Sequence, residues 1–373
     1  MIYMQQGTFN PSLEQDVTPF DRNLSIYWPK TAGATNYIMS AKDLAAPQLI
    51  IRRPHLSRAL PTGRCLVLGV SGQVGNALVE ELGTLNCFGT YSTSAVSNAT
   101  ELSFHKIASD PDMMAQLLTS TKPDVVYICA AKTWVDGCES QVRDAEIVNQ
   151  EVPALITKIA KAFGTKVVFF STDYVFDGTA GPYHEDAETS PLNVYGKSKL
   201  EAEKAIMSID TSALIIRTTI VYGPEELGKN FVYQFVSKLL AGEKCACLDD
   251  QYSTPTYNRD LAQMVTQLVS RGCSGVYNCT GTEVMSRFEF AMKVTRSLNL
   301  DDSLLERVST ENLEAQALKA GKRLAKRGLK LGLRVGKALR DLGDFKLRTV
   351  EESMCDWLER PFGKLLLPNT GAS

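Results

Sequence analysis

Cys65-Leu-Val-Leu-Gly-Val-Ser-Gly-Gln-Val-Gly75 is the segment that best predicts the architecture of this chain. A short apolar run leads into three glycines, and the amphipathic segment 76–82 follows. Glycine permits a tight turn and a close approach of the backbone to a pyrophosphate, and a helix N-terminus offers free N–H groups to phosphate. The pattern predicts a strand, a turn and a helix that bind a dinucleotide through Gly69, Gly72, Gln73, Val74 and Gly75. Taken alone, the glycines could also form an ordinary strand-to-helix turn, which is the less favoured alternative.

Apolar strand-like runs alternate with helical patterns from residue 64 onward, and this alternation becomes weaker after Pro224. Strands are expected at 65–68, 125–129, 166–170 and 213–216, and helices include 141–163 and 192–208. Strands that alternate with helices favour parallel pairing with helices on both faces. The sequence therefore predicts an α/β fold with a Rossmann-type, doubly wound parallel sheet.

The second informative segment joins Ser171 and Thr172 at the end of an apolar run to Tyr195 and Lys199. In open α/β sheets the carboxyl ends of the strands carry the ligands, so the two hydroxyls are expected at the site. Tyrosine and lysine four residues apart share one face of a helix, where the ammonium would lower the tyrosine pKa. Thr172, Tyr195 and Lys199 together predict reduction of a carbonyl or oxidation of an alcohol. A buried helix tyrosine and an exposed lysine form the structural alternative.

The predicted cofactor is a nicotinamide dinucleotide. A strand ending in Ala130 and Ala131 would let its ribose approach, although two alanines also suit tight packing. The second strand is expected at 87–92, and no acid stands at its end to bind a ribose 2′-hydroxyl. Ser92 or Thr93 could instead bind a 2′-phosphate. NADP is therefore favoured, and NAD stays compatible.

Composition agrees with a globular enzyme. The 373 residues are 44% hydrophobic and 22% charged, with a net charge of −2, so neither nucleic acid nor membrane is expected as a partner. The nine cysteines lack the spacing of a zinc site and read as reduced thiols, which favours a cytoplasmic location and no metal.

The glycine spacing and the Tyr-x-x-x-Lys pair resemble those of the extended short-chain dehydrogenase/reductases, and among them the dTDP-4-dehydrorhamnose reductases. The resemblance spans about residues 64–360. The matching strings are Gly72–Gly75, Thr133-x-Val-Asp136-x-x-Glu139, Asn149, Ser171–Gly178, Pro191–Glu201, Arg217-Thr218, Asn230-Phe231 and Asp250–Thr256.

This resemblance implies an NAD(P)H-dependent reductase of a nucleotide-linked 4-keto-hexose, with a homo-oligomer as a family expectation. It implies a Rossmann domain at 61–224 and a smaller substrate-binding lobe mainly at 225–360, with segments returning to the core. Residues 1–60 have no counterpart in these reductases and are expected to form an extra arm of unknown role, with 361–373 as a tail. Substrate-binding residues are expected among Trp134, Asp136, Asp173, Asn230 and Gln251.

Two departures from the reductase pattern, and one basic segment, bear on the ligands. Ile220 stands where these enzymes usually carry a tryptophan near the pyranose, so Trp134 is the candidate replacement, with a buried packing role as the alternative. No aspartate stands at 102–107, near the expected adenine. The basic segment 319–340 reads as a solvated helical face, or as a source of Arg327 or Arg334 for the substrate diphosphate.

Two other functions stay open. One is a nucleotide-sugar epimerase or a dehydratase-like relative, although Tyr174 follows Asp173 as in the reductases. The other is a non-catalytic, NADP-binding regulatory subunit such as the β subunit of methionine adenosyltransferase, which shares the fold and many of the motifs.

Overall fold

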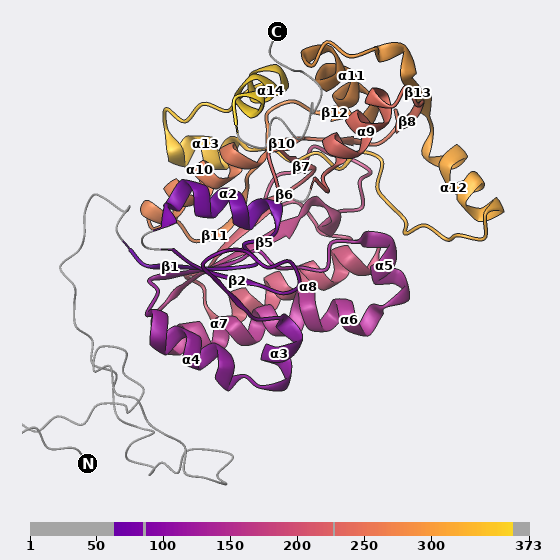
Figure 1. Ribbon diagram of the computed structural model, residues 1–373. Helices are drawn as coiled ribbons and strands as arrows, with labels where there is room; N and C mark the ends of the chain where they lie inside the picture. The colour runs from indigo at the N-terminus through magenta and orange to yellow at the C-terminus, as the bar shows by residue number, and fades with distance from the viewer. Residues whose placement is uncertain (1–62, 85–86, 227, 361–373) are drawn as a thin grey trace, which may run out of the picture.

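A seven-stranded parallel sheet forms the centre of the molecule, in the strand order β11-β6-β5-β4-β1-β2-β3 (Figure 1). The computed structural model describes residues 63–84, 87–226 and 228–360. Its sheet strands are β1 (Cys65–Leu68), β2 (Cys87–Tyr91), β3 (Ala99–Glu101), β4 (Val125–Ile128), β5 (Lys166–Thr172), β6 (Leu214–Thr218) and β11 (Gly275–Asn278). The predicted fold class is confirmed. The predicted arm 1–60 and tail 361–373 lie outside the described residues.

Two of the three glycines after β1 are required by the close packing of the turn. Gly69 has φ +97°, and a Cβ there would lie 2.8 Å from the backbone nitrogen of Ala130. A Cβ on Gly75 would lie 2.2 Å from the carbonyl oxygen of Gly69. Gly72 caps helix α2 (Gln73–Leu82), and a Cβ on it would meet no atom closer than 3.5 Å. The turn therefore presses the helix N-terminus against the strand end.

Helices cover both faces of the sheet (Figure 1). On one face, α2 packs with α10 (Asn258–Ser270) and α13 (Gly336–Leu342) against apolar side chains such as Val67, Val168 and Ile216. The other face carries α3 (Phe104–Ser109), α4 (Asp112–Thr121), α7 (Val152–Ala162) and α8 (Val194–Ile209). Because side chains alternate along a strand, Leu66 and Leu68 belong to this second core.

A smaller lobe has its own core, with Phe235, Phe290 and Trp357 among its buried side chains. Short strand pairs brace it: β7 (Val221–Tyr222) with β10 (Thr256–Tyr257), β9 (Tyr252–Ser253) with β12 (Met285–Ser286), and β8 (Cys245–Leu248) with β13 (Leu305–Val308). Its helices are α9 (Phe231–Leu240), α11 (Arg287–Ser297), α12 (Thr310–Lys319) and α14 (Val350–Leu358), with the 3₁₀ turn η5 (Asp302–Leu304). Three elements that lie among these in the sequence belong to the main sheet instead: β11 is one of its strands, and α10 and α13 pack against it.

Several predicted boundaries shift in ways that concern the site. Strand β5 runs on to Thr172, so Ser171 and Thr172 are its last two residues instead of following it. The helix predicted at 141–163 is broken into α6 (Val142–Glu146), the π-helix η3 (Ile147–Glu151) and α7. Strands β3 and β11 were not predicted, because β3 is short and polar and β11 follows a long departure from the sheet.

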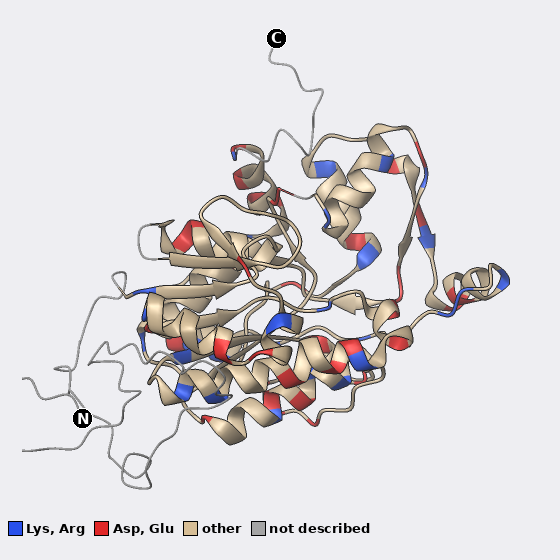
Figure 2. Ribbon diagram, turned by 60° about the horizontal axis from the view of Figure 1, so that its bottom comes forward, with Lys and Arg blue, Asp and Glu red and all other residues tan. Residues whose placement is uncertain are grey.

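The interpretation of 319–340 as one helical face is wrong. Helix α12 ends at Lys319, and no helix forms between Ala320 and Val335. Instead, this segment crosses other loops in extended form: Leu333 bridges to Tyr183 and Lys330 bridges to Tyr252. Lys and Arg positions are interspersed with Asp and Glu along the helices in the foreground of Figure 2. The bridges to Tyr183 and Tyr252 tie the basic segment to the loops around the site.

Candidate active site

A cavity of about 1040 Å³ lies at the carboxyl ends of the strands, where an open α/β sheet is expected to bind its ligands. It is large enough to hold a ligand of considerable size. The structure brings most of the predicted site residues to its wall: Gly69, Gly72, Gln73, Val74, Gly75, Ser92, Ala130, Ala131, Trp134, Thr172, Asp173, Tyr195, Lys199, Asn230 and Gln251.

Thr172 and Asp173 form the floor of the cavity at the end of β5. The Thr172 hydroxyl donates to Asp173 Oδ1 (3.1 Å) and accepts from the backbone nitrogen of Tyr174 (3.2 Å), which starts the 3₁₀ turn η4 (Asp173–Val175). Thr219 Oγ1 donates to Asp173 Oδ2 (2.5 Å). Burial raises the pKa of Asp173 to about 6, although both hydroxyls oppose that shift. A carboxyl group therefore lies directly beside the predicted catalytic threonine.

Tyr195 and Lys199 lie one turn apart on α8, whose N-terminus is capped by the Asn193 side chain. The Tyr195 ring meets the edge of Tyr174 at 6.0 Å between centroids. The Lys199 ammonium is buried, 3.9 Å from the centroid of the Phe169 ring. Tyrosine and lysine thus line the same cavity on one face of the helix, as predicted.

The expectation that Lys199 lowers the pKa of Tyr195 is wrong for this arrangement. Desolvation first, and the Asp173 carboxylate second, raise the pKa of Tyr195 well above its ordinary value. Desolvation lowers the pKa of Lys199 to about 7, with Glu203 acting in the opposite direction. Burial thus favours the neutral form of both groups, so Tyr195 is held as a proton donor.

Ser171 does not face the cavity as a free hydroxyl. Its Oγ donates to Glu203, which lies one turn beyond Lys199 on α8. Arg217, at the next strand, completes the network with a hydrogen bond from Nη2 to Glu203 Oε2 of 2.7 Å and from Nη1 to the Glu185 carbonyl of 3.0 Å. Side chains of Arg217 and Glu203 are each about 5% exposed. This buried pair anchors β5, β6 and α8 to one another behind the site.

Asn149 is a further supporting residue, and its sequence context alone predicts no role for it. Its fully buried side chain accepts from the Lys132 backbone nitrogen (2.8 Å) and donates to the Lys132 carbonyl (3.1 Å) and to Ser198 Oγ (3.3 Å). The π-helix η3 positions it, and π-helical turns are common at functional sites. Asn149 therefore holds the loop after β4 against the helix that carries Tyr195 and Lys199.

The cofactor end of the cavity fits a dinucleotide. The close-packed turn at Gly69 and Gly75 leaves Gly72 open at the start of α2, whose first N–H groups lack partners within the helix. Ser92, Thr93 and Ser94 line the wall after β2, with no acid among them. The buried Thr218 hydroxyl, also in the wall, has no hydrogen-bond partner among the described residues. These groups offer donors to phosphate, ribose or amide oxygens.

Three other predicted residues hold the site together. With its amide oriented to suit its neighbours, Gln73 donates to the Val221 carbonyl (2.9 Å) and accepts from the Gly223 nitrogen (3.2 Å). Asn230 caps α9 through Oδ1 and donates to the Gly223 carbonyl (2.9 Å). Gln251 donates to Thr310 Oγ1 (3.1 Å). Their side-chain amides line the cavity, but each already makes at least one hydrogen bond to a neighbouring residue.

Asp136 is the predicted substrate-binding residue that lies outside the cavity lining. Its carboxylate accepts from the Ala325 nitrogen (2.8 Å) and from Arg327 Nη2 (3.0 Å). Arg327 does line the cavity, but its Nη1 also donates to the Ala325 carbonyl. Arg334 lies away from the cavity wall and donates to the Pro182 carbonyl. Asp136 thus fixes the arginine instead of facing a substrate.

Trp134 is 66% exposed and lines the cavity, so its predicted alternative as a packing residue is wrong. A Cβ on Gly137 would come within 2.3 Å of the indole, which shows that the ring lies directly on this glycine. One side of the indole is therefore supported by Gly137, and most of the side chain is exposed. Ile220 also lines the cavity, with φ +36°, an unusual conformation for a β-branched residue.

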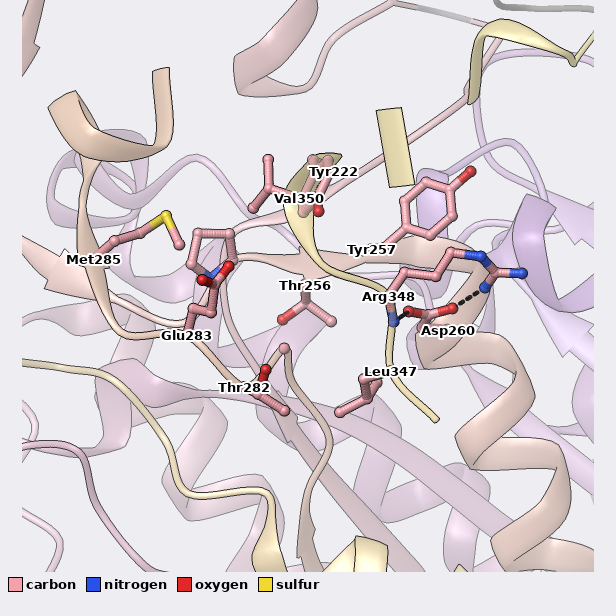
Figure 3. A pocket seen from close by; sticks show the side chains of 12 residues that line it. Tyr222, Thr256, Tyr257, Asp260, Thr282, Glu283, Met285, Leu347, Arg348 and Val350 are labelled. Atoms are coloured by element: carbon pink, nitrogen blue, oxygen red, sulfur yellow. Dashed lines mark hydrogen bonds and ion pairs between the residues drawn. The ribbon is translucent and has the colours of Figure 1, made fainter. Parts of the chain in front are cut away.

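A second cavity, of about 10 Å³, lies between β10, α10 and the segment before α14 (Figure 3). Asp260 accepts from the Arg348 backbone nitrogen at 2.8 Å on one side of it. This space could hold about one water molecule, so it is no candidate for a substrate site. Within the described ranges, no group of three or more His, Cys, Asp or Glu is placed to bind a metal, and no helix is long and apolar enough to cross a membrane.

Comparisons with known proteins agree with this geometry. The chain is 31% identical over 268 residues to methionine adenosyltransferase 2 subunit beta of Xenopus tropicalis, covering 69% of this chain and 78% of that one. It is 34% identical over 244 residues to dTDP-4-dehydrorhamnose reductase of Burkholderia thailandensis, covering 63% and 78%. The structure of dTDP-4-dehydrorhamnose reductase from Bacillus anthracis in complex with NADP superposes with a TM-score of 0.68 at 27% identity, covering 79% and 98%. The family model "RmlD substrate binding domain" matches residues 63–359, and the chain belongs to that family.

Proposed function

We propose that this chain is an NADPH-dependent reductase of a nucleotide-linked 4-keto-hexose. The observation that carries the proposal is the convergence of Thr172, Tyr195 and Lys199 on one cavity with the glycine turn. In this proposal residues 61–224, with the returning segments, bind the cofactor, and most of 225–360 closes over the sugar nucleotide.

Each catalytic side chain has a defined task in this proposal. The hydride would come from bound NADPH. Tyr195, kept protonated by its surroundings, donates its proton to the oxygen of the former carbonyl. Thr172 donates a hydrogen bond to the same oxygen as negative charge develops there, for which its hydroxyl must turn from Asp173. Lys199, in the wall of the same cavity, would hold the cofactor ribose and return a proton toward Tyr195.

Cofactor preference gives a prediction. Because the wall after β2 carries Ser92, Thr93 and Ser94 and no acid, it lacks the carboxylate that would bind a ribose 2′-hydroxyl and repel a 2′-phosphate. NADPH is expected to bind at least as tightly as NADH in a titration of intrinsic fluorescence. A clear preference for NADH would show that the adenosine ribose lies elsewhere.

Trp134 gives a second prediction, in which its exposed indole stacks on the sugar. Trp134→Ala is expected to raise KM or lower kcat/KM, while NADPH affinity and the melting temperature stay close to wild type because the ring is largely exposed. Gly137→Ala is the matched variant, since its methyl group would displace the supported indole without removing it. If both variants keep wild-type kinetics, Trp134 has no part in substrate binding.

The experiment for the reductase itself follows NADPH oxidation in the presence of a panel of keto-sugar nucleotides. The proposal expects consumption with at least one 4-keto-hexose. The similarity to methionine adenosyltransferase 2 subunit beta favours a second candidate, a non-catalytic subunit that binds NADP and regulates a partner enzyme. That candidate expects tight NADPH binding with no consumption on any sugar of the panel.

A further inference from the structure

Arg287 is a cavity residue to which no role has been assigned. It is the first residue of α11 and follows the capping box formed by Ser286 and Glu289. Its backbone nitrogen donates to the Gln251 carbonyl (3.2 Å), and the pairing of β12 with β9 fixes the preceding residues. The side chain therefore projects into the cavity from a rigid support.

The guanidinium of Arg287 differs in its partners from that of Arg327, which lies in the same cavity wall. Among the described residues, its side chain has no hydrogen bond and no ion pair, whereas Arg327 is bound by Asp136 and by the Ala325 carbonyl. The group lies against the Phe231 ring, with its central carbon 5.5 Å from the ring centroid. A ring face orients the cation but satisfies none of its five N–H donors.

Arg287 lines the same cavity as the predicted catalytic residues Thr172 and Tyr195. Arg287 and Asp173 line the same cavity, and the positive charge of Arg287 lowers the pKa of Asp173 against the larger effect of burial. Asp173 lies beside Thr172. Asp173 and Glu225 are the acidic residues in the lining, and Glu225 accepts from the Asn230 backbone nitrogen. Within the described part of the chain, no carboxylate forms an ion pair with Arg287.

We infer that Arg287 is the residue of this cavity that binds an oxyanion. The substrate therefore carries a phosphoryl or carboxylate group near the reacting sugar. A planar guanidinium with free donors suits two oxygens of such a group. The identification of this anion as part of a sugar nucleotide rests on the proposed function. Arg287 thus takes the role that the sequence suggested for Arg327 or Arg334.

The test measures binding, so it does not depend on turnover. Calorimetry follows dTDP, inorganic pyrophosphate and glucuronate binding to the NADPH-saturated full chain. Arg287→Gln is expected to weaken binding of the recognised anion by about 10- to 100-fold, the range for a lost charge-assisted hydrogen bond. Arg287→Lys keeps the positive charge but loses the planar set of donors. Its affinity for the anion is therefore expected to lie between those of wild type and Arg287→Gln.

Arg307→Gln is the matched control. Arg307 also lies over an aromatic ring, 4.1 Å from the centroid of Phe288, but it is outside the cavity lining. Its replacement is expected to leave all three affinities unchanged, and NADPH affinity is expected to be constant in every variant. Loss of dTDP and pyrophosphate binding assigns the site to the diphosphate, and loss of glucuronate binding alone assigns it to a sugar carboxylate.

Two results would overturn the inference. One is Arg287→Gln binding all three probes as wild type does, and the other is a wild-type chain that binds none of them. Neither result depends on NADPH oxidation. A chain that binds dTDP through Arg287 but reduces no sugar would keep this inference and refute the reductase.

Discussion

Tyr195→Phe is expected to reduce turnover by about 100- to 10,000-fold, the usual range for loss of a general acid. The change removes only the hydroxyl, and the ring keeps its contact with Tyr174. NADPH affinity and melting temperature are therefore expected to stay near wild type. Steady-state rates of NADPH oxidation, together with a fluorescence titration of NADPH, measure both quantities.

Tyr183→Phe is a suitable control for this variant. Its hydroxyl donates to Asp177 (2.7 Å) away from the cavity, so its loss is expected to affect stability and not turnover. Near wild-type turnover in Tyr195→Phe would refute the proposed proton transfer.

Lys199→Met is expected to reduce turnover by at least about 100-fold and to weaken NADPH binding as well, because one ammonium serves both tasks. Lys197→Met on the same helix is the matched control, since Lys197 is exposed. Equal effects of the two replacements would show that Lys199 has no special role.

Lys199→Met is also expected to change the stability of the folded chain. The pKa of Lys199 falls from its ordinary value of 10.5 to about 7 on folding. Between those pH values the unfolded chain binds a proton that the folded chain releases, so this lysine makes stability rise with pH across the window. Below pH 7 Lys199 is protonated in both the folded and the unfolded chain, so the folded chain bears the full free-energy cost of burying the charged ammonium. Lys199→Met is therefore expected to raise the melting temperature at pH 7 and to remove this part of the pH dependence, as measured by thermal unfolding without added cofactor.

Local patterns were sufficient to predict the parts of the fold and site that lie close in the chain. Gly69 and Gly75 are needed for one tight turn, and Tyr195 and Lys199 share one helix face, so their spacing alone is informative. The family resemblance is confirmed by the match over residues 63–359.

Contacts between distant segments could not be predicted in this way. Asp136 belongs to a string shared with the reductases, but its partner Arg327 arrives from a loop 191 residues away. Arg287 had no motif to mark it, because its significance depends on its cavity position and on its lack of a polar side-chain partner among the residues that the structure describes. The pKa of Tyr195 likewise depends on burial and on Asp173, which helix spacing does not reveal.

Transfer of deuterium from NADPH labelled at the reactive C4 position of the nicotinamide tests the reductase proposal most directly. Each 4-keto-hexose nucleotide of the panel is incubated with the wild-type chain and labelled cofactor, and the sugar product is examined by mass spectrometry and NMR. One deuterium is expected on the carbon of the newly formed alcohol, and the rate of its transfer is expected to fall in Tyr195→Phe. Labelled NADPH that binds tightly yet leaves every sugar of the panel unlabelled would contradict the reductase proposal.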